Sequence, residues 1–390
     1  TNAAPMLVYR GYDKLAAAFL ISCFRFMTTP DSQAQIQVYQ QDPHELKAWI
    51  KAQARELGFS DCVIARPDAQ AELPRLQEYL ERGYHGDMKF LEENLDKRAN
   101  PTLLIPNTRS VICVRMDYLV ESPEPRMVPD APNSAIIARY ARGRDYHKTM
   151  RGRLKMLSAK IKEKVGEFES RPFADSAPVF EKSLAENAGM GWTGKHTLLI
   201  HKKSGSFFVL GELFTSLELP FDEPTTKHCG SCTACIDICP TQAIVEPYML
   251  DARRCIAYLT IEYKGIIPED LRRGIGNRVF GCDDCQLICP WNSFAKTTTI
   301  ADFHPRNGLD QASLLDLWQW DEPTFLASTE GSPLRRTGYQ SFMRNIAIGL
   351  GNAPFNPAII QALQNSRAQH DEVVQVHIDW SIQEQLSKSR

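Results

Sequence analysis

The chain has 390 residues, of which 43% are hydrophobic and 24% are charged, and its formal net charge is -2 at pH 7. This composition excludes a disordered or fibrous protein, and the charge excludes a uniformly basic nucleic-acid coat, although local basic patches stay open. The length favours two or three packed units over one.

The N-terminal stretch LAAAFLISCFRFM, residues 15–27, is apolar but too short to span a bilayer, and Arg25 interrupts it. Its length is that of the apolar region of a signal peptide, so export or lipid attachment at Cys23 is the alternative interpretation. No twin-arginine pair precedes the stretch. We therefore expect residues 1–43 to be an extension, disordered or partly helical, on a cytoplasmic protein without a membrane span.

The next segment combines helices and strands. Apolar residues at helical spacing from His44, in HELKAWIKAQARELGF, predict a helix that ends at Gly58. Further expected elements are strands over 61–67, 110–119 and 134–141, a helix over 146–165, and a hairpin over 197–213 that turns at Ser204 and Gly205. These elements predict an α+β protein that opens with a mixed α/β domain over residues 44–216.

The remainder of the chain divides into two further regions. Residues 217–228 are rich in proline and acid and predict a connection into a cysteine-rich, ferredoxin-like domain over 217–300. Residues 301–390 carry mostly amphipathic helical patterns and predict a helical region. Helix pairs of the HEAT-repeat kind are one arrangement for it, but no fixed period supports them.

Eight of the eleven cysteines fall between residues 229 and 289. The first run, CGSCTACIDICP, has the C-x2-C-x2-C-x3-C-P spacing of bacterial ferredoxins, in which three thiolates bind one [4Fe-4S] cluster and the fourth binds a second. The second run, CDDCQLICP, has Val279 where its first cysteine would stand, and Cys255, outside both runs, completes the count. The expected ligands are Cys229, Cys232, Cys235 and Cys289 for one cluster, and Cys239, Cys255, Cys282 and Cys285 for the other.

Zinc is the alternative for this region, because paired C-x2-C elements also bind that metal. A zinc ribbon gives no reason for the C-x3-C-P continuation in both runs, so the spacing favours iron–sulfur clusters and a reducing compartment. The other cysteines, Cys23, Cys62 and Cys113, are expected to be small apolar side chains. Clusters move electrons singly, so an acceptor must lie elsewhere. Haem and dinucleotide motifs are absent, which leaves a flavin or a corrinoid.

Five strings stand in order along the chain: YHGDMKFL, RYARGRDYHK, FADSAP, LAENAGMGWTGKH and GNRVFGCDDCQLICPWN. Together with the position of Cys255, they resemble the bacterial epoxyqueuosine reductase family, from about His44 to the C-terminus. The resemblance implies an oxidoreductase that converts epoxyqueuosine to queuosine at the wobble position of tRNA. That reaction takes two electrons and two protons, releases water and leaves an alkene.

The resemblance also implies a cobalamin bound between the α/β domain and the cluster domain. Asp175, in FADSAP, stands at the family position of the acid that protonates the departing oxygen, and the positions that contact the corrinoid correspond to Arg98, Ala138, Asp175 and Leu199. A free aspartate, with a pKa of about 3.9, is ionised at neutral pH, so this acid would need an apolar pocket that raises its pKa. From the residues alone Asp175 is a turn or cap residue. Tyr146 and His147 are candidate ligands, although a lone histidine near a helix start is more often a cap or a solvent contact.

Basic residues provide two candidate tRNA contacts. Residues 139–164 contain ten Lys or Arg against two acids, which is an electrostatic footprint for phosphate, although a solvated helix face is the ordinary explanation. A second group in the C-terminal region comprises Arg335, Arg336 and Arg344. Both groups would position a backbone without reading its sequence.

Two other functions stay open on the sequence. A reductive dehalogenase also joins a corrinoid domain to two clusters, but such enzymes usually carry a twin-arginine export signal and act on small organohalides. An electron-carrier module would explain the clusters but would leave the α/β domain without a role. On the favoured interpretation the partners are tRNA and a reduced flavodoxin- or ferredoxin-type donor, and we expect a monomer.

Overall fold

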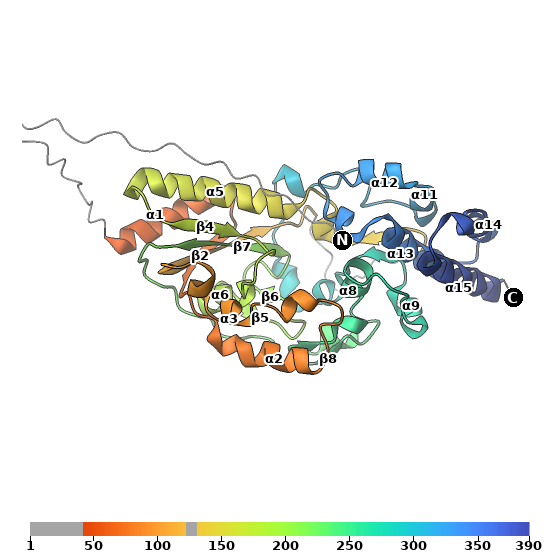
Figure 1. Cartoon of the computed structure of the whole chain (residues 1–390), viewed down its shortest axis with the longest axis horizontal. Coiled ribbons are helices and arrows are strands. Elements are labelled where there is room, and N and C mark those ends of the chain that lie inside the picture. The colour runs from red at the N-terminus through yellow and green to blue at the C-terminus, as the bar shows by residue number, and fades with distance from the viewer. Residues whose placement is uncertain (1–41, 122–130, 390) are drawn as a thin grey trace, which may run out of the picture. The chain divides into compact units, whose positions relative to one another are not determined.

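A four-stranded antiparallel sheet lies at the centre of the N-terminal part of the chain (Figure 1). The structure, a computed structural model, describes residues 42–121 and 131–389. The strands run in the spatial order β1-β2-β7-β4, and their bounds are Asp61–Ala65 for β1, Ser110–Asp117 for β2, Phe208–Thr215 for β7 and Ser170–Phe173 for β4. Every residue of β2 is buried, because this strand has a neighbour on each side and helices above and below it.

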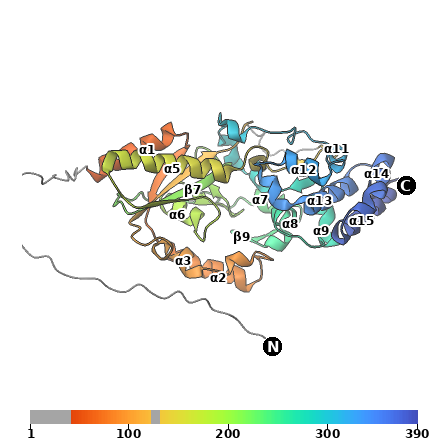
Figure 2. The ribbon, with the colours of Figure 1, turned by 45° about the horizontal axis from the view of Figure 1, so that its top comes forward.

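Helices cover both faces of this sheet. The first face carries α1 (Pro43–Glu56) and α5 (Tyr146–Val165), and the other carries α6 (Glu181–Asn187), as Figures 1 and 2 show. Gly211 of β7 lets α5 approach closely, since a Cβ atom there would come within 2.6 Å of the Met150 side chain. Successive side chains along β7 point to opposite faces of the sheet, so Leu213 packs with α1 and α5, whereas Phe214 packs with α6.

Four of the predicted elements are confirmed. The helix from His44 is α1, the helix over 146–165 is α5, and the first two strands are β1 and β2. The strand predicted over 134–141 is wrong for most of its length. Apart from an isolated bridge between Ser134 and Ser313, only β3 (Ile136–Ile137) pairs there, and Arg139–Ala141 form a 3-10 turn.

The hairpin predicted over 197–213 is also wrong. Its first half, β6 (Leu199–Ile200), pairs with β5 (Trp192–Thr193), and its second half, β7, joins the central sheet. Only one bridge, between His201 and Gly205, spans the predicted turn. The physical reason is burial. The second half of this run is rich in apolar residues, and at the centre of the sheet both of its faces are covered by packed side chains.

The cysteine-rich region is built from short elements. Helices α7 (Ala234–Asp237) and α10 (Asp284–Leu287) contact each other and carry Cys235 and Cys285. Strand β10 (Arg278–Phe280) pairs in parallel with β3 and so joins this region to the α/β part. The remaining elements are α8 (Ile256–Ile261), α9 (Glu269–Ile275), β8 (Ile244–Glu246) and β9 (Met249–Leu250), together with α2 (Leu73–Glu81), α3 (Leu95–Ala99) and α4 (Pro101–Leu104) nearer the N-terminus.

The C-terminal part is helical, as predicted. Its helices are α11 (Leu314–Trp318), α12 (Glu322–Ser328), α13 (Tyr339–Asn352), α14 (Pro357–Ser366) and α15 (Glu372–Lys388). Arg344 of α13 is fully buried and donates hydrogen bonds to the carbonyl oxygens of Leu259, Tyr263 and Gly265. It ties the C-terminal helices to the cysteine-rich region, so the prediction that Arg344 contacts phosphate is wrong.

The described residues, 42–121 and 131–389, belong to one compact unit by their contacts. Within it the domain boundaries at 217 and 301 and the HEAT-like arrangement stay predictions. The predictions for the apolar stretch and Cys23 lie outside the described residues. In the part of the chain that the structure covers, no helix has the length and apolarity that a membrane crossing requires. Cys62 and Cys113 are buried in β1 and β2, as predicted.

Candidate active site and electron path

Four of the predicted ligand cysteines gather at a surface hollow of about 440 Å³, which is lined by Cys229, Cys232, Cys235 and Cys289. Cys232 is exposed to solvent. Lys195 anchors this loop, because its Nζ donates hydrogen bonds to the carbonyl oxygens of Gly230 and Cys232 at 2.7 and 2.9 Å. Burial and then the neighbouring thiols raise the pKa of Cys235 to about 11. We call these four the outer cysteines.

The other four, Cys239, Cys255, Cys282 and Cys285, are each partly buried, and Cys282 lines a separate cavity of about 330 Å³. We call them the inner cysteines. Burial raises the pKa of Cys285 well above its usual value, and the nearby thiols of Cys255, Cys235 and Cys239 add to this effect. Among the residues described, no set of His, Cys, Asp or Glu side chains converges on a single metal ion. The structure brings the cysteines into the two groups that the sequence predicted, and their assignment as cluster ligands stays a prediction.

Asp175 lies where three cavities adjoin, with volumes of about 330, 600 and 740 Å³. The 330 Å³ cavity extends from Asp175 to Cys282 of the inner cysteines, and its apolar wall includes Leu199 and Leu210. The 740 Å³ cavity extends to Arg98. The 600 Å³ cavity extends to Arg335 and Arg336. A single carboxyl group therefore borders every part of this hollow.

The start of α5 holds the Asp175 side chain. The Tyr146 hydroxyl donates to Asp175 Oδ2 at 3.0 Å, and His147 Nε2 lies 3.2 Å from the same oxygen. His147 Nδ1 lies 2.6 Å from Oδ1 of Asp145, which is the N-cap of α5. Asp175 has a left-handed φ of 57°, a conformation that aspartate adopts more readily than most residues. The His147 imidazole thus lies between two carboxylates.

Hydrogen bonds set the protonation of this group. The bond from His147 lowers the pKa of Asp175, although burial opposes it. Burial lowers the pKa of His147, but the bonds to Asp145 and Asp175 outweigh this effect and raise that pKa to about 9. The Asp175 side chain is 52% exposed, so solvent weakens the interaction. At neutral pH the proton therefore resides on His147. Asp175 was expected to have a raised pKa, but in the protein without its cofactor and substrate the pKa of Asp175 is lowered.

The other predicted corrinoid contacts lie at different depths. Arg98 is 8% exposed, and its Nη2 donates to the carbonyl oxygen of Phe90 at 2.8 Å. Leu199 lines the 330 Å³ cavity directly. Ala138 lies one layer behind it, because a Cβ atom on the cavity residue Gly281 would come within 2.6 Å of the Ala138 Cβ.

These features fit the cobalamin that the resemblance implies. The apolar wall suits the face of a macrocycle, and Gly281, with a φ of 69°, leaves that wall open beside Cys282. Burial alone lowers the pKa of Arg98, so no acid faces it closely. Its guanidinium has five N–H donors, of which backbone carbonyls use two, and the rest are free for an anionic group.

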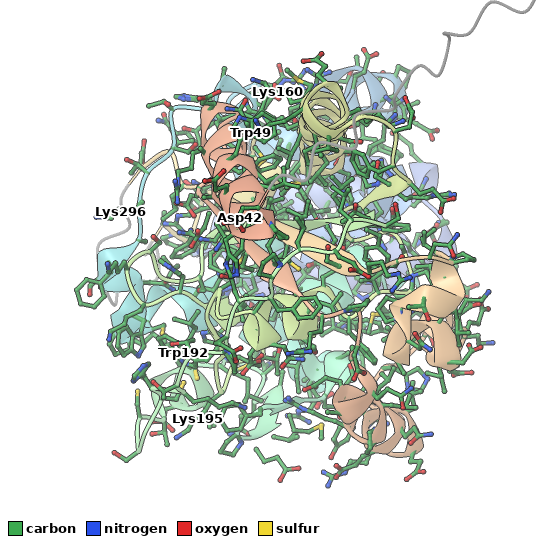
Figure 3. The ribbon with its side chains drawn as sticks, turned by 90° about the vertical axis from the view of Figure 1, so that its left-hand side faces the viewer. Asp42, Trp49, Lys160, Trp192, Lys195 and Lys296 are labelled. Atoms are coloured by element: carbon green, nitrogen blue, oxygen red, sulfur yellow. The ribbon has the colours of Figure 1, made fainter. Side chains whose placement is uncertain are left out.

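The basic run of residues 139–164 divides between the hollow and the back of α5. Lys148 lines the 600 Å³ cavity with Arg335 and Arg336. Arg153, in contrast, donates to the carbonyl oxygen of Leu57 at the end of α1. Lys160 also lies against α1, as Figure 3 shows, and its Nζ is 2.6 Å from the Gln53 side chain. This part of the run holds two helices together.

Sequence reasoning missed two acids beside Asp175. Glu181, the first residue of α6, accepts a hydrogen bond from the Asp175 backbone N–H at 2.5 Å and lines the 330 Å³ cavity. Glu212 is fully buried in β7. The available signal was a single acid within the apolar run FFVLGELF. The role of His147 was also missed, because a cap or a solvent contact was expected. The N-cap of α5 is Asp145, and the His147 imidazole faces Asp175.

The fold and the site together define an iron–sulfur-dependent reductase. A family model described as a 4Fe-4S double cluster binding domain matches residues 228–292, which contain all eight outer and inner cysteines. This match confirms the prediction of two clusters over the zinc alternative. A second model, described as "Epoxyqueuosine reductase QueG, DUF1730", matches residues 98–176.

Related proteins align with nearly the whole segment, from about His44 to the C-terminus, that carries the resemblance. An epoxyqueuosine reductase from Pseudomonas aeruginosa is 52% identical over 342 residues, which are 87% of this chain and 95% of the relative. One from Escherichia coli is 47% identical over 347 residues, 89% of this chain and 91% of the relative. The chain belongs to the epoxyqueuosine reductase family.

Solved structures of this family share the fold. The structure of epoxyqueuosine reductase from Streptococcus thermophilus has a TM-score of 0.79 and 26% identity, and the match covers 88% of this chain and 90% of that one. A crystal structure of epoxyqueuosine reductase with an epoxyqueuosine-modified tRNA stem loop has a TM-score of 0.77 and 25% identity, over 88% of this chain and all of that one. The α+β fold that the sequence predicted is confirmed.

Proposed function

We propose that this chain reduces epoxyqueuosine to queuosine in tRNA, with the hollow around Asp175 as its active site. The observation that carries the proposal is that one cavity joins a proton-bearing group, Asp175 with His147, to Cys282 of the inner cysteines. Electrons and protons can therefore reach the same space. Membership of the epoxyqueuosine reductase family supports the substrate, and it does not favour a reductive dehalogenase or a bare electron carrier.

The cofactors of the reaction are two [4Fe-4S] clusters and a cobalamin. The outer cysteines hold the cluster nearer to solvent, and the inner cysteines hold the cluster nearer to the cavity. Cys285 lies close enough to Cys235 for their charges to interact, so the two clusters are neighbours. Electrons thus enter at the outer cluster and leave from the inner one.

The residues that would hold the cobalamin are Arg98, at the far end of the 740 Å³ cavity, and Leu199, in the apolar wall. Ala138 contributes indirectly. Its Cβ leaves no room for a side chain at position 281, so the cavity wall stays open there. When bound, the cobalamin supplies a reduced cobalt that can deliver electron density to a carbon of the epoxide. Asp175 faces the same space and delivers a proton to the departing oxygen.

Asp175 and His147 work as a unit in this step. His147 Nε2 carries the proton at neutral pH and donates it toward Asp175 Oδ2. As the epoxide oxygen becomes basic, the His147 proton moves to Asp175, which passes it on to that oxygen and is left ionised beside a neutral imidazole. Tyr146 and Asp145 hold the two side chains in place through bonds of 3.0 and 2.6 Å.

The tRNA would approach through the 600 Å³ cavity. Lys148, Arg335 and Arg336 line this cavity and can contact phosphates on either side of the modified nucleoside. An anticodon-loop base can leave its stack at little cost, because it is not paired in a duplex. The related structure with a modified tRNA stem loop supports this class of substrate.

We place the electron donor at the hollow of the outer cysteines. Lys296 is exposed two residues after Phe294, which lines this hollow, and Lys202 and Lys203 are exposed on the loop whose Ser206 backbone N–H donates to the Asn292 side chain. A basic rim around an exposed cluster suits an acidic flavodoxin- or ferredoxin-type protein. We further propose that the protein is a monomer and acts in the cytoplasm, where tRNA meets a reducing environment.

The test is mass spectrometry of tRNA nucleosides. Anaerobic protein with both clusters, cobalamin and a chemical reductant is incubated with tRNA that carries epoxyqueuosine. Conversion to queuosine with loss of one oxygen is the expected result. If epoxyqueuosine persists while iron content and bound cobalamin are complete, the proposed function is wrong.

A further inference from the structure

A buried acid lies directly behind the active site without any evident structural use. Glu212 is fully buried in the central strand β7, and neither of its carboxylate oxygens has a hydrogen-bond partner among the residues described. Strand alternation places it on the same face as Phe208 and Leu210, which line the 330 Å³ cavity. Buried polar groups are nearly always satisfied, so an unpaired acid in a sheet centre requires a reason.

The closest charged neighbour of Glu212 is another acid. Burial raises the pKa of Glu212 well above its usual value, and the charge of Glu181 adds to this effect. Burial likewise raises the pKa of Glu181 to about 7, with Asp175 as the next cause. Two adjacent carboxylates in a poorly solvated site cannot both ionise, so the pair keeps a proton through neutral pH. The other titratable groups that face the pair are Asp175, His147, Tyr146, Lys182 and the Cys113 thiol.

The pair is connected to the reacting space. Glu181 begins α6 and lines the 330 Å³ cavity, and its Oε1 lies 2.5 Å from the backbone nitrogen of Asp175. Glu181 therefore stands between the sealed Glu212 and the acid that faces the substrate. Two neighbouring carboxyl groups, Glu212 and Glu181, thus lead from the sheet centre to the cavity, and Glu181 meets Asp175 at its backbone N–H.

The reaction needs a second proton. Both C–O bonds of the epoxide break, two electrons become the new π bond of the alkene, and the oxygen leaves as water with two added protons. His147 and Asp175 hold one of these at neutral pH. Asp175 is 52% exposed in the protein alone, but substrate and cofactor that fill the adjoining cavities would exclude the water that could resupply it.

We propose that Glu181 and Glu212 form an internal proton store that supplies the second proton of the reaction. Glu212 passes its proton to Glu181, and Glu181 passes a proton to Asp175 after Asp175 has protonated the departing oxygen. Solvent restores the store when the product leaves. This inference rests on the proposed function, and it assigns both glutamates as positioning residues that act through Asp175.

The test is a pH series of single turnovers with the reconstituted, pre-reduced protein and epoxyqueuosine-bearing tRNA. In Glu212→Gln the side chain keeps its shape but carries no transferable proton, and Glu181 loses its coupled partner. We expect the rate constant, divided by that of the wild type at the same pH, to fall about tenfold or more between pH 6 and pH 8, since an uncoupled carboxyl loses its proton tenfold per unit above its pKa. Glu181→Gln removes the group that hands the proton to Asp175, so its relative rate should be low at every pH of the series.

The control is Glu186→Gln, on the same helix, whose carboxylate faces Thr193 and Lys227 instead. Its relative rate should be flat across the series. A flat ratio for Glu212→Gln, or an equal fall at every pH, would overturn the proton store and leave the proposed function intact, whereas an inactive wild type would contradict the proposed function itself. If Glu212→Gln does not fold, infrared spectroscopy of the wild type decides: absence of a protonated-carboxyl band at pH 7 and above overturns the inference.

Discussion

At the scale of single residues, the site depends on where one aspartate is held. Asp175 occupies a left-handed backbone conformation, accepts hydrogen bonds from Tyr146 and His147, and borders three cavities. The partners fix its Oδ2 and lower its pKa, so the proton sits on the imidazole until the reaction demands it. We therefore propose that the acid function belongs to a pair of side chains rather than to the carboxyl alone.

Asp175→Ala should retain both clusters and cobalamin but lose about 10² to 10⁴-fold in turnover, the usual worth of a positioned general acid. Iron analysis, cobalamin titration and the nucleoside assay measure the three quantities. Asp175→Asn is the matched variant, because it keeps the backbone preference and the hydrogen bonds without a transferable proton. Near-wild-type rates in both variants would remove the role of Asp175.

His147 predicts a loss of activity at alkaline pH. Its pKa is raised from 6.5 to about 9, so the His147–Asp175 ion pair stabilises the fold fully below pH 6.5 and is lost as the pH rises through about 9. Above that value the rate should fall about tenfold per pH unit, since the proton donor disappears with the imidazolium. A single-turnover pH profile checks this. His147→Gln should abolish the alkaline limb, and a limb unchanged in that variant contradicts the assignment.

At the scale of elements, the start of α5 and the 3-10 turn before α13 bring basic residues to the active-site hollow. Lys148 and Arg335 line the 600 Å³ cavity, and both are exposed. The far end of α5 has a different role, since Lys162 pairs with Glu167 at 2.7 Å and Arg153 bonds the end of α1. Phosphate contact is therefore expected from one end of the helix only.

Charge reversal at Lys148 and Arg335 together should weaken tRNA binding and lower the slope of log affinity against log salt by about one for each phosphate that the protein no longer neutralises. Binding titrations at several salt concentrations measure both effects. Lys162→Glu, at the far end of α5, is the control and should leave the slope unchanged. Equal slopes for all three proteins would show that the tRNA binds elsewhere.

A substitution at Gly281, just after β10, is expected to create a packing defect against Ala138, just after β3. Gly281→Ala would place a Cβ atom 2.6 Å from the Ala138 Cβ at a φ of 69°, next to Cys282. We expect a loss of about 1–3 kcal/mol in the free energy of unfolding and a weakened cobalamin site. Denaturant titration and cobalamin binding measure these. Gly152→Ala, in the middle of α5 with open space around it, is the control.

At the scale of the whole molecule, the two groups of cysteines lie between solvent and the active site. The outer cysteines line a surface hollow, and Cys282 of the inner group lines the active-site cavity. Helix α13 fastens this region from the C-terminal side through Arg344 and through Asn345, which donates to the carbonyl oxygens of Thr260 and Val279. The C-terminal helices thus brace the cysteine-rich region through which we propose that electrons pass.

Because the outer cysteines line a surface hollow, we expect an acidic electron-donor protein to bind there. Reversing the charge of Lys202, Lys203 and Lys296 together should slow reduction by a flavodoxin- or ferredoxin-type protein, most strongly at low salt. Reduction by a small chemical reductant should stay at the wild-type rate. Stopped-flow absorbance of the clusters measures both. Lys160→Glu, on the side that faces α1, is the control, and equal slowing in it would refute the surface.

Features that depend on local spacing could be predicted from the amino-acid order alone. The cysteine runs predicted the two clusters, because thiolates must stand at set intervals to wrap a cluster. The apolar periodicity predicted α1, α5 and β2. The resemblance pointed to Asp175, and the structure places it at the junction of the three cavities.

Which residues meet across the chain depended instead on three-dimensional packing. The run 197–213 had the pattern of one hairpin, yet its halves joined different sheets, since burial on two faces outweighs a local turn. Arg344 had the pattern of a phosphate contact, but its guanidinium lies among backbone carbonyls. His147, Glu181 and Glu212 come from separate elements, and their pKa values depend on burial and on one another, neither of which a linear sequence displays.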